Sequence, residues 1–292
     1  MYAAKSQNNA LAALLVTAAT AFIAGTTLLA KALGSDDFGA GLHPAQIVWG
    51  RFTFALMGFG LAYAVLRPAL QRPHLGLHVL RTGSGAAGLA LTVAAVQVIP
   101  LADATAISFL SPVFGMFFAI LFLRERVGPW RWLAAGIALA GMLVLLRPAP
   151  GQFEAGALFA LGAAVVFGFE LIVIKQLTRR ENPFSILIVN NIVGVCMMSV
   201  LVLWVWQAPS GPQWAMMAAL GLMMAVAQTC FINGMARADA SFVAPFSYGT
   251  LIFAALYDAL FYGVIPDAVT LIGATIIIAG ALLLAWREGR AR

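Results

Sequence analysis

Long uncharged runs alternate along the chain with short segments that hold charges, glycines and prolines. An apolar run of about 20 residues spans the hydrocarbon core of a bilayer as one helix, and turn residues between the runs mark helix ends. The pattern therefore predicts an all-α integral membrane protein with ten transmembrane helices, at about residues 10–33, 44–66, 81–99, 104–123, 130–146, 154–177, 183–206, 213–235, 240–262 and 267–286.

The composition agrees with a chain that lies almost wholly in a membrane. Of its 292 residues, 62% are hydrophobic and 10% are charged, and the mean hydropathy is +0.95, whereas a soluble domain has about 25% charged residues. These values exclude a soluble enzyme, a disulfide scaffold and a nucleic-acid binder. The first run is too long for a signal peptide. Cys196 and Cys230 lie within apolar runs, where we interpret them as small buried hydrophobic residues.

The basic residues indicate the orientation of the chain, because loops rich in Lys and Arg stay in the cytoplasm. If the amino terminus is cytoplasmic, all 17 Lys and Arg residues except Lys31, Arg51 and Arg147 fall in cytoplasmic segments. This set includes Arg81, which we place at the cytoplasmic start of the third span. We therefore expect a multi-pass protein of the bacterial inner (plasma) membrane with both termini in the cytoplasm.

The two halves of the chain contain similar segments. Ile137–Leu146 aligns without gaps on Ile276–Ala285, and five of the ten positions are identical. Five spans in each half would invert the second copy relative to the first. We therefore predict a first five-helix repeat at 1–147 and a second, inverted one at 148–292. Inverted repeats are typical of secondary transporters, whose substrate site lies near the midplane where the copies meet.

One segment carries a family resemblance. Val98–Gly115, with the sequence VIPLADATAISFLSPVFG, and Phe122–Val127, with the sequence FLRERV, resemble the EamA-type family of the drug/metabolite transporter superfamily. A proline that opens the second span and is followed by an arginine, here Pro44 and Arg51, fits the same family. The resemblance implies two inverted five-helix repeats around a central cavity that exports or imports small metabolites. Among the members, the bacterial aromatic amino-acid exporters are the most similar.

The second half departs from this family pattern at two places. Val264 stands where the second repeat often has an acidic residue equivalent to Glu125, so a symmetric gate built on paired glutamates is not expected. Tyr248 stands near the position that corresponds to Pro112, and we expect Pro245 to break the helix in its place.

Charged residues inside the spans are candidates for function, because they are costly in a bilayer. Arg51 and Asp258 lie at similar depths near the outer ends of their spans, so they could form a pair in an outer vestibule. Alternatively, Arg51 extends toward the interface and Asp258 simply lies near it. Glu170 could bind an amine or carry a coupled proton, or it could be a structural partner of a polar group on a neighbouring helix or of the nearby Lys175.

Polar and aromatic residues within the spans supply further candidates. The polar ones can bind substrate or only connect neighbouring helices; they are Thr26, Gln97, Ser108, Ser111, Asn190, Asn191, Gln228, Asn233 and Ser247. Among the aromatic residues, Tyr248, Phe246 and Phe22 are the candidates for an apolar cavity that accepts a ring, although such residues often pack in a core. The predicted substrate-binding or gating set is therefore Glu170, Arg51, Asp258, Tyr248, Phe246 and Phe22.

Motifs for catalysis, cofactors and metals lack the required context. Gly83–Gly88 has the glycine spacing of a dinucleotide-binding fingerprint, but it opens a membrane helix with no strand before it. His74 and His78 are four residues apart, yet a third metal ligand is missing. We therefore expect no catalytic residues, no cofactor and no metal.

We accordingly predict a secondary transporter that moves small amphipathic metabolites by alternating access, and specifically an exporter of aromatic or other neutral amino acids. The alternatives are a transporter of another metabolite or drug, an intramembrane enzyme and a structural subunit. The expected partners are the small-molecule substrate and the lipid bilayer, with no nucleic acid, and the protein is expected to be a monomer or weak homodimer.

Overall fold

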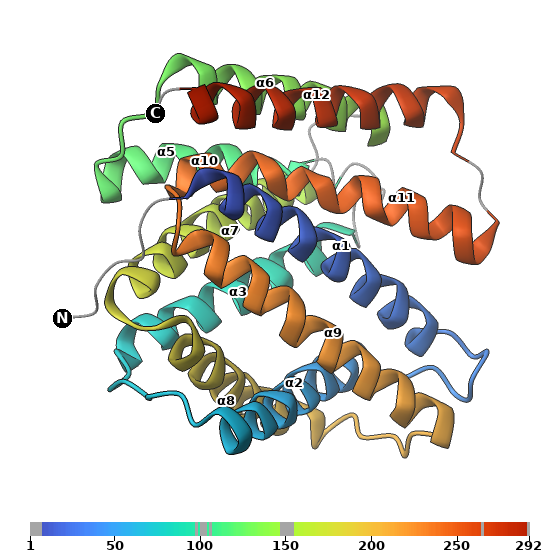
Figure 1. Ribbon diagram of the computed structural model, residues 1–292. Helices are drawn as coiled ribbons and strands as arrows, with labels where there is room; N and C mark the ends of the chain where they lie inside the picture. The colour runs from blue at the N-terminus through green and yellow to red at the C-terminus, as the bar shows by residue number, and fades with distance from the viewer. Residues whose placement is uncertain are drawn as a thin grey trace.

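The computed structural model describes residues 8–96, 99, 104, 107–146, 155–263 and 266–290, which form a bundle of helices (Figure 1). Apart from an isolated bridge between Asp37 and Gly39, all regular structure in these residues is helical. The elements are α1 (Asn9–Gly34), α2 (Pro44–Leu66), α3 (Leu75–Val96), α5 (Ser111–Leu123), α6 (Pro129–Leu146), α7 (Ala155–Arg180), α8 (Pro183–Val202), α9 (Gly211–Met235), α10 (Ala240–Val243), the 3-10 helix η1 (Ala244–Tyr248), α11 (Gly249–Tyr262) and α12 (Ala268–Arg290).

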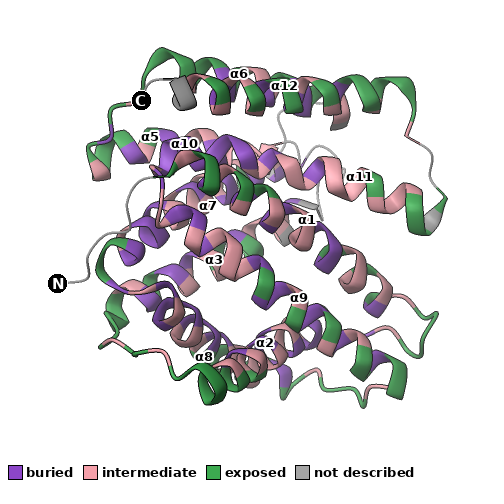
Figure 2. Ribbon diagram, viewed as in Figure 1, coloured by how far each residue is buried: buried purple, intermediate pink, exposed green. Residues whose placement is uncertain are grey.

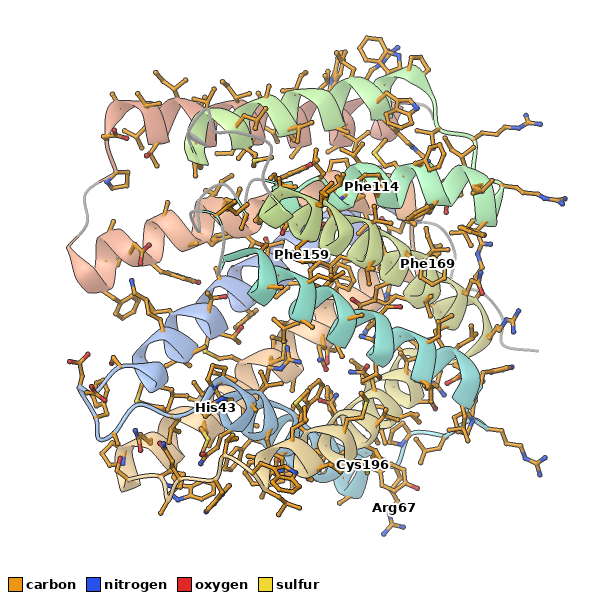
Figure 3. The ribbon with its side chains drawn as sticks, turned by 180° about the vertical axis from the view of Figure 1, so that it is seen from behind. His43, Arg67, Phe114, Phe159, Phe169 and Cys196 are labelled. Carbon is orange, nitrogen blue, oxygen red and sulfur yellow. The ribbon has the colours of Figure 1, made fainter. Side chains whose placement is uncertain are left out.

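Most of the predicted spans coincide with these helices. Seven helical segments in the described part of the chain are long and apolar enough to cross a membrane, and α5 and α6 are shorter apolar helices. Local capping residues mark the first turns of two of these helices. Asn182 caps α8 immediately before Pro183, and Ser210 and Gln213 form a capping box at the start of α9. Both cysteines are free, and Cys196 on α8 is exposed rather than buried as predicted (Figure 3). Its apolar run forms a membrane helix with an outward face as well as a core-facing one.

Three predicted spans differ from the structure. The third helix begins at Leu75, not at Arg81, and the polar His78 in its first turn bonds to Glu181 inside the protein. In the fourth, a turn at residues 109–110 precedes α5. The ninth span is divided into α10, η1 and α11. Pro245 lies at the start of η1, where it cannot donate a backbone hydrogen bond. The prediction that Pro245 interrupts this helix is confirmed.

The helices pack in pairs that combine early and late parts of the chain. In Figure 1, α1 lies along α9, α3 along α7, and α6 along α12 at one edge of the bundle. The last pair is close because Gly141 and Gly273 face each other: a Cβ on either would lie 2.8 Å from the carbonyl oxygen of the other. Small residues at such positions let membrane helices approach closely.

Burial follows this arrangement. Figure 2 shows buried residues concentrated where α1, α7 and α10 meet, while α6 and α12 present many exposed positions. The exposed positions include large apolar side chains such as Leu271 and Leu282. An apolar outer surface of this kind suits contact with lipid rather than water.

One end of the bundle carries most of the basic residues, and we call it the basic face. It is formed by the α2–α3, α5–α6, α7–α8 and α9–α10 connections, and α1 begins and α12 ends there (Figure 1). Arg67 extends away from the bundle at this face (Figure 3). The basic residues in or beside these connections are Arg67, Arg72, Arg124, Arg126, Arg131, Arg179, Arg180, Arg237 and Arg287.

Glu181 connects α3 and α7 at the basic face and is fully buried. The backbone N–H of His74 donates to Oε1 of Glu181 at 2.6 Å, and the His74 ring nitrogen Nδ1 lies 3.0 Å from the same oxygen. Nε2 of His78 lies 3.0 Å from Oε2. Burial by itself raises the pKa of the Glu181 carboxyl, but the hydrogen bonds from His74 and His78 outweigh it, so the pKa is lower than its usual value.

We predict that Glu181→Gln lowers the midpoint of thermal unfolding by about 5 °C, since a hydrogen bond to a charged group contributes about 1.5–3 kcal/mol. Because folding lowers the pKa of Glu181, its contribution is fully present above the pKa of the unfolded state and is lost as the pH falls through the folded pKa. Thermal unfolding of detergent-solubilised protein between pH 7.5 and 4 measures both effects. Asp36→Asn, at an exposed carboxylate, is the control, and an equal loss in both variants would contradict the prediction.

Candidate functional site

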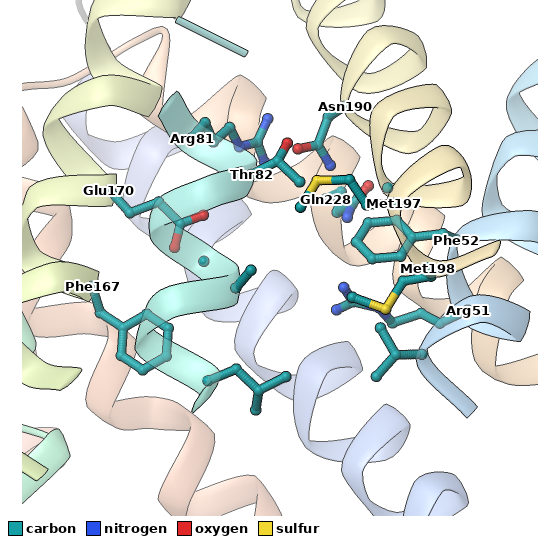
Figure 4. A pocket seen from close by; sticks show the side chains of 15 residues that line it. Arg51, Phe52, Arg81, Thr82, Phe167, Glu170, Asn190, Met197, Met198 and Gln228 are labelled. Atoms are coloured by element: carbon teal, nitrogen blue, oxygen red, sulfur yellow. The ribbon is translucent and has the colours of Figure 1, made fainter. Parts of the chain in front are cut away.

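A cavity of about 290 Å³ lies inside the bundle between α2, α3, α7 and α8, with Gln228 of α9 at its back (Figure 4). Its walls carry three charged side chains, Arg51, Arg81 and Glu170. Each comes from a different helix, so the cavity brings together charges that are far apart in the sequence.

Arg51 enters the cavity from α2, seven residues after the Pro44 that begins this helix. Its guanidinium lies 4.3 Å from the centre of the Phe52 ring, close enough for a cation–π contact. Its Nε is buried and has no hydrogen-bond partner among the described residues. The aromatic contact therefore positions Arg51 but leaves donor capacity unused.

Arg81 enters from α3 and is only 6% exposed. Six residues of helix precede it, which places it about 9 Å from the start of α3 at 1.5 Å per residue. Its Nε and one terminal nitrogen, Nη1, are buried and find no acceptor within the described part of the protein. Thr82, the next residue, also has a buried hydroxyl without a partner. Unused donors of this kind are uncommon in folded proteins and are costly unless something completes them.

Glu170 enters from α7, and both of its carboxylate oxygens lie 3.5 Å from the position that a Cβ on Gly85 would occupy. It interacts electrostatically with Arg81 and Arg51, but among the described ion pairs neither arginine lies within 4 Å of it. Lys175, its predicted structural partner, instead donates to the carbonyl oxygens of Met235 and Ala238. The three cavity charges therefore face one another without direct contact.

The remaining walls combine amides with apolar groups. Asn190 and Gln228 line the cavity, and Gln228 accepts a 2.9 Å hydrogen bond from Asn191. Phe167 forms an aromatic wall that fits only because residue 88 is glycine: a Cβ there would lie 2.6 Å from the ring. Leu89 continues the apolar side, and Met197 and Met198 of α8 also face the cavity (Figure 4).

A second, larger opening of about 630 Å³ lies between α1, α9 and α11. Its walls are mainly aliphatic and aromatic, including Leu28, Met223 and Tyr257, and Asp37 is its one charged lining residue among those described. Because it lacks the converging polar groups that orient a ligand, the cavity with the three charges is the better candidate site.

The predicted pair of Arg51 and Asp258 is wrong. Asp258 lies on α11, where its Oδ1 is 3.8 Å from Nζ of Lys31 in a well-exposed pair. Arg51 lines the cavity between α2 and α8 instead. The two residues have similar depths, but depth does not say toward which neighbour a helix turns a given side chain.

The three predicted aromatic residues are not among those that line the described cavities. Tyr248 is fully buried, donates to the carbonyl oxygen of Phe109 at 2.8 Å and stacks on that ring. Phe246 packs against Phe242 in the core, and Phe22 is half-buried on α1. The two rings that line the charged cavity are Phe52 and Phe167.

Sequence reasoning missed Arg81, because it treated each charged residue near a run as the end of a span. The apolar residues Leu75, Leu77, Val79 and Leu80 before it were a signal that the helix starts earlier. Of the polar candidates, Asn190 and Gln228 line the cavity, whereas the Thr26 hydroxyl donates to a carbonyl of its own helix. Gln97 lies outside the described residues.

His74 and His78 share Glu181 as a hydrogen-bond partner. No group of three or more His, Cys, Asp or Glu residues in the described ranges is arranged to hold a metal ion. Within Gly83–Gly88, Gly85 lies beside Glu170 and Gly88 lies beneath Phe167, whereas a Cβ on Gly83 would meet nothing within 4 Å.

Comparisons with known proteins find transporters among the relatives of this chain. The chain is 29% identical to a riboflavin transporter of Vibrio cholerae over 252 residues, which cover 82% of this chain and 85% of the relative. It is 27% identical to an S-adenosylmethionine uptake transporter of Rickettsia felis, with 88% of each chain covered. These names do not support a specific likeness to aromatic amino-acid exporters.

A solved crystal structure shares the fold, with a TM-score of 0.76 and 23% identity, and the match covers 94% of this chain and 97% of the other. The family model for EamA-like transporters matches twice, at residues 10–147 and 154–286. The chain therefore belongs to the EamA-like transporter family and is a multi-pass membrane transporter.

Proposed function

We propose that this protein is a secondary transporter that carries a small amphipathic metabolite across the bacterial inner membrane by alternating access, with the charged cavity as its substrate site. The observation that carries the proposal is that Arg51, Arg81 and Glu170 line one cavity inside the bundle, where Nε of Arg51 and both Nε and Nη1 of Arg81 are buried without a hydrogen-bond partner among the described residues. Ionisable groups at membrane depth mark substrate or ion pathways.

The proposed division into inverted five-helix repeats at 1–147 and 148–292 has two supports. The family model matches each half separately. The helix packing is also consistent with two equivalent halves, in which α1 corresponds to α7, α3 to α9 and α5 to α11. The contact of α1 with α9 then matches the contact of α7 with α3, and the contact of α1 with α11 matches that of α7 with α5. The cavity receives side chains from both halves, which suits a site at the interface between repeats.

Alternating access requires that each end can open while the other is closed. At the basic face, the backbone N–H of Gln71 donates to Oγ of Ser185 at 3.0 Å, and that of Asn182 donates to Oε1 of Gln71. At the opposite face, Gln46 and Gln207 exchange two hydrogen bonds of 2.6 and 3.1 Å. We assign the basic face, with both termini, to the cytoplasm.

The proposed substrates are aromatic and other neutral amino acids, in the export direction. Charges of both signs and the Phe167 wall support an amphipathic zwitterion. The relatives are named for riboflavin and for uptake of S-adenosylmethionine, so both compounds and both directions belong in the assay. An enzymatic role has less support, because Glu170 is the one carboxylate among the described cavity residues.

We predict that Glu170→Gln lowers the rate of labelled phenylalanine transport in proteoliposomes by about tenfold or more, because it removes a charge-assisted contact of about 1.5–3 kcal/mol. The amide keeps nearly the same shape, so expression and thermal stability should change little. Asp258→Asn, in the exposed pair with Lys31, is the matched control and should transport normally. A wild-type rate for Glu170→Gln from pH 5 to 8 would remove Glu170 from the site.

We further predict that a disulfide between Gln71→Cys and Ser185→Cys stops transport, since these residues are in contact across the basic face. The pair is introduced after Cys196 and Cys230 are replaced by serine. Transport should fall on oxidation and recover with dithiothreitol, while each single cysteine variant stays active under both conditions. Undiminished transport by fully crosslinked protein would show that this face does not open during the cycle.

A further inference from the structure

We propose that Arg51 and Arg81 together bind a carboxylate of the substrate and that Glu170 binds a positively charged group of the same molecule. The inference rests on the proposed transport function and adds which side chains hold each charged group of a zwitterion that carries a carboxylate, an ammonium group and an apolar side chain.

The need for a carboxylate follows from the state of Arg81. A guanidinium that is 6% exposed, with buried Nε and Nη1 donors and no described acceptor, lacks the partners that buried charges require. Glu170 is in electrostatic range but not in contact. A planar carboxylate offers two acceptor oxygens that match two neighbouring guanidinium donors. Thr82 adds a buried, unpartnered hydroxyl beside this position.

Arg51 acts on the same group from the facing wall. It projects from α2 into the cavity that Arg81 enters from α3 (Figure 4). The two positive charges interact with each other through the cavity, and like charges repel at short range in a medium of low dielectric constant. A bound anion reduces this repulsion and accepts a hydrogen bond from Nε of Arg51, which has no described partner.

Glu170 completes the recognition of a zwitterion. Its carboxylate lies beside Gly85, one helical turn from Arg81 on α3, and accepts none of the described hydrogen bonds. An ammonium group supplies three donors, and its charge balances a carboxylate in surroundings where an isolated charge is costly.

The apolar part of the substrate has space along the same face of α3. Arg81 and Leu89 are eight residues apart, which corresponds to about 12 Å of helix. Phe167 lies against Gly88 near the Leu89 end. The cavity therefore offers charged groups toward the Arg81 end of α3 and apolar groups toward the Leu89 end.

The test compares three ligands that differ by one charged group: phenylalanine, phenylethylamine, which lacks the carboxylate, and 3-phenylpropionate, which lacks the amine. Each competes with labelled phenylalanine for transport by the full-length protein in proteoliposomes. In the wild type, we expect phenylalanine to compete about tenfold better than either analogue.

The variants should remove these preferences selectively. With Arg81→Gln, the advantage of phenylalanine over phenylethylamine should disappear, while its advantage over 3-phenylpropionate remains. With Glu170→Gln, the reverse is expected.

Ligand-dependent shifts of the unfolding temperature give the same comparison where transport is too slow to measure. Arg126→Gln, at an exposed arginine of the basic face, should keep both preferences, and Arg51→Gln should repeat the Arg81 result if Arg81→Gln does not fold.

The inference is overturned if phenylethylamine competes as well as phenylalanine in the wild type, or if the preferences survive both arginine substitutions. It is also overturned if none of the three ligands binds while riboflavin or S-adenosylmethionine is transported, and in that case the transport function stands. If none of these compounds is transported in either direction, the proposed function fails as well.

Discussion

The free-energy cost of burying a charge away from water is the constraint on which this structure depends. In a membrane protein each ionisable group must meet a partner inside the bundle, reach the interface or face a water-filled cavity. Glu181 meets the first condition through His74 and His78, and Lys175 does so through two backbone carbonyls. The groups at the basic face therefore hold helices together and have little capacity left for a ligand.

The charged cavity lined by Arg51, Arg81 and Glu170 is different, because its charges are only partly satisfied. Arg51 contacts the Phe52 ring, Arg81 is buried with no described hydrogen-bond acceptor, and Glu170 forms no described ion pair with either arginine. Burying charges without partners costs more free energy than burying paired ones, and in the proposed function a ligand of matching charge offsets this cost. In the proposed function, the same groups that would destabilise an ordinary core provide both affinity and selectivity for the substrate.

Glycines give the cavity its shape. Gly88 allows the Phe167 ring to approach α3, and Gly194 allows the Phe52 ring to approach α8: a Cβ at either position would lie within 2.6 Å of the ring. The close pair of Gly141 and Gly273 joins α6 and α12 at the other edge of the bundle. We expect a larger residue at Gly88 or Gly194 to displace the aromatic ring that it faces and to separate the two helices in contact there.

The sequence by itself determined the helical class, most helix positions, the break at Pro245 and the presence of Arg51 and Glu170 within membrane helices, because apolar run length and intramembrane charge are properties of the local chain. Only the tertiary structure decided that Arg81 lines the same cavity as Arg51 and Glu170. It also decided that Asp258 forms an ion pair with Lys31 and that Tyr248 donates a hydrogen bond to the carbonyl oxygen of Phe109 in the core. These outcomes depend on how each helix is rotated and which neighbour it packs against. That choice is made by contacts between residues far apart in the chain, which periodicity and depth along a single helix do not specify.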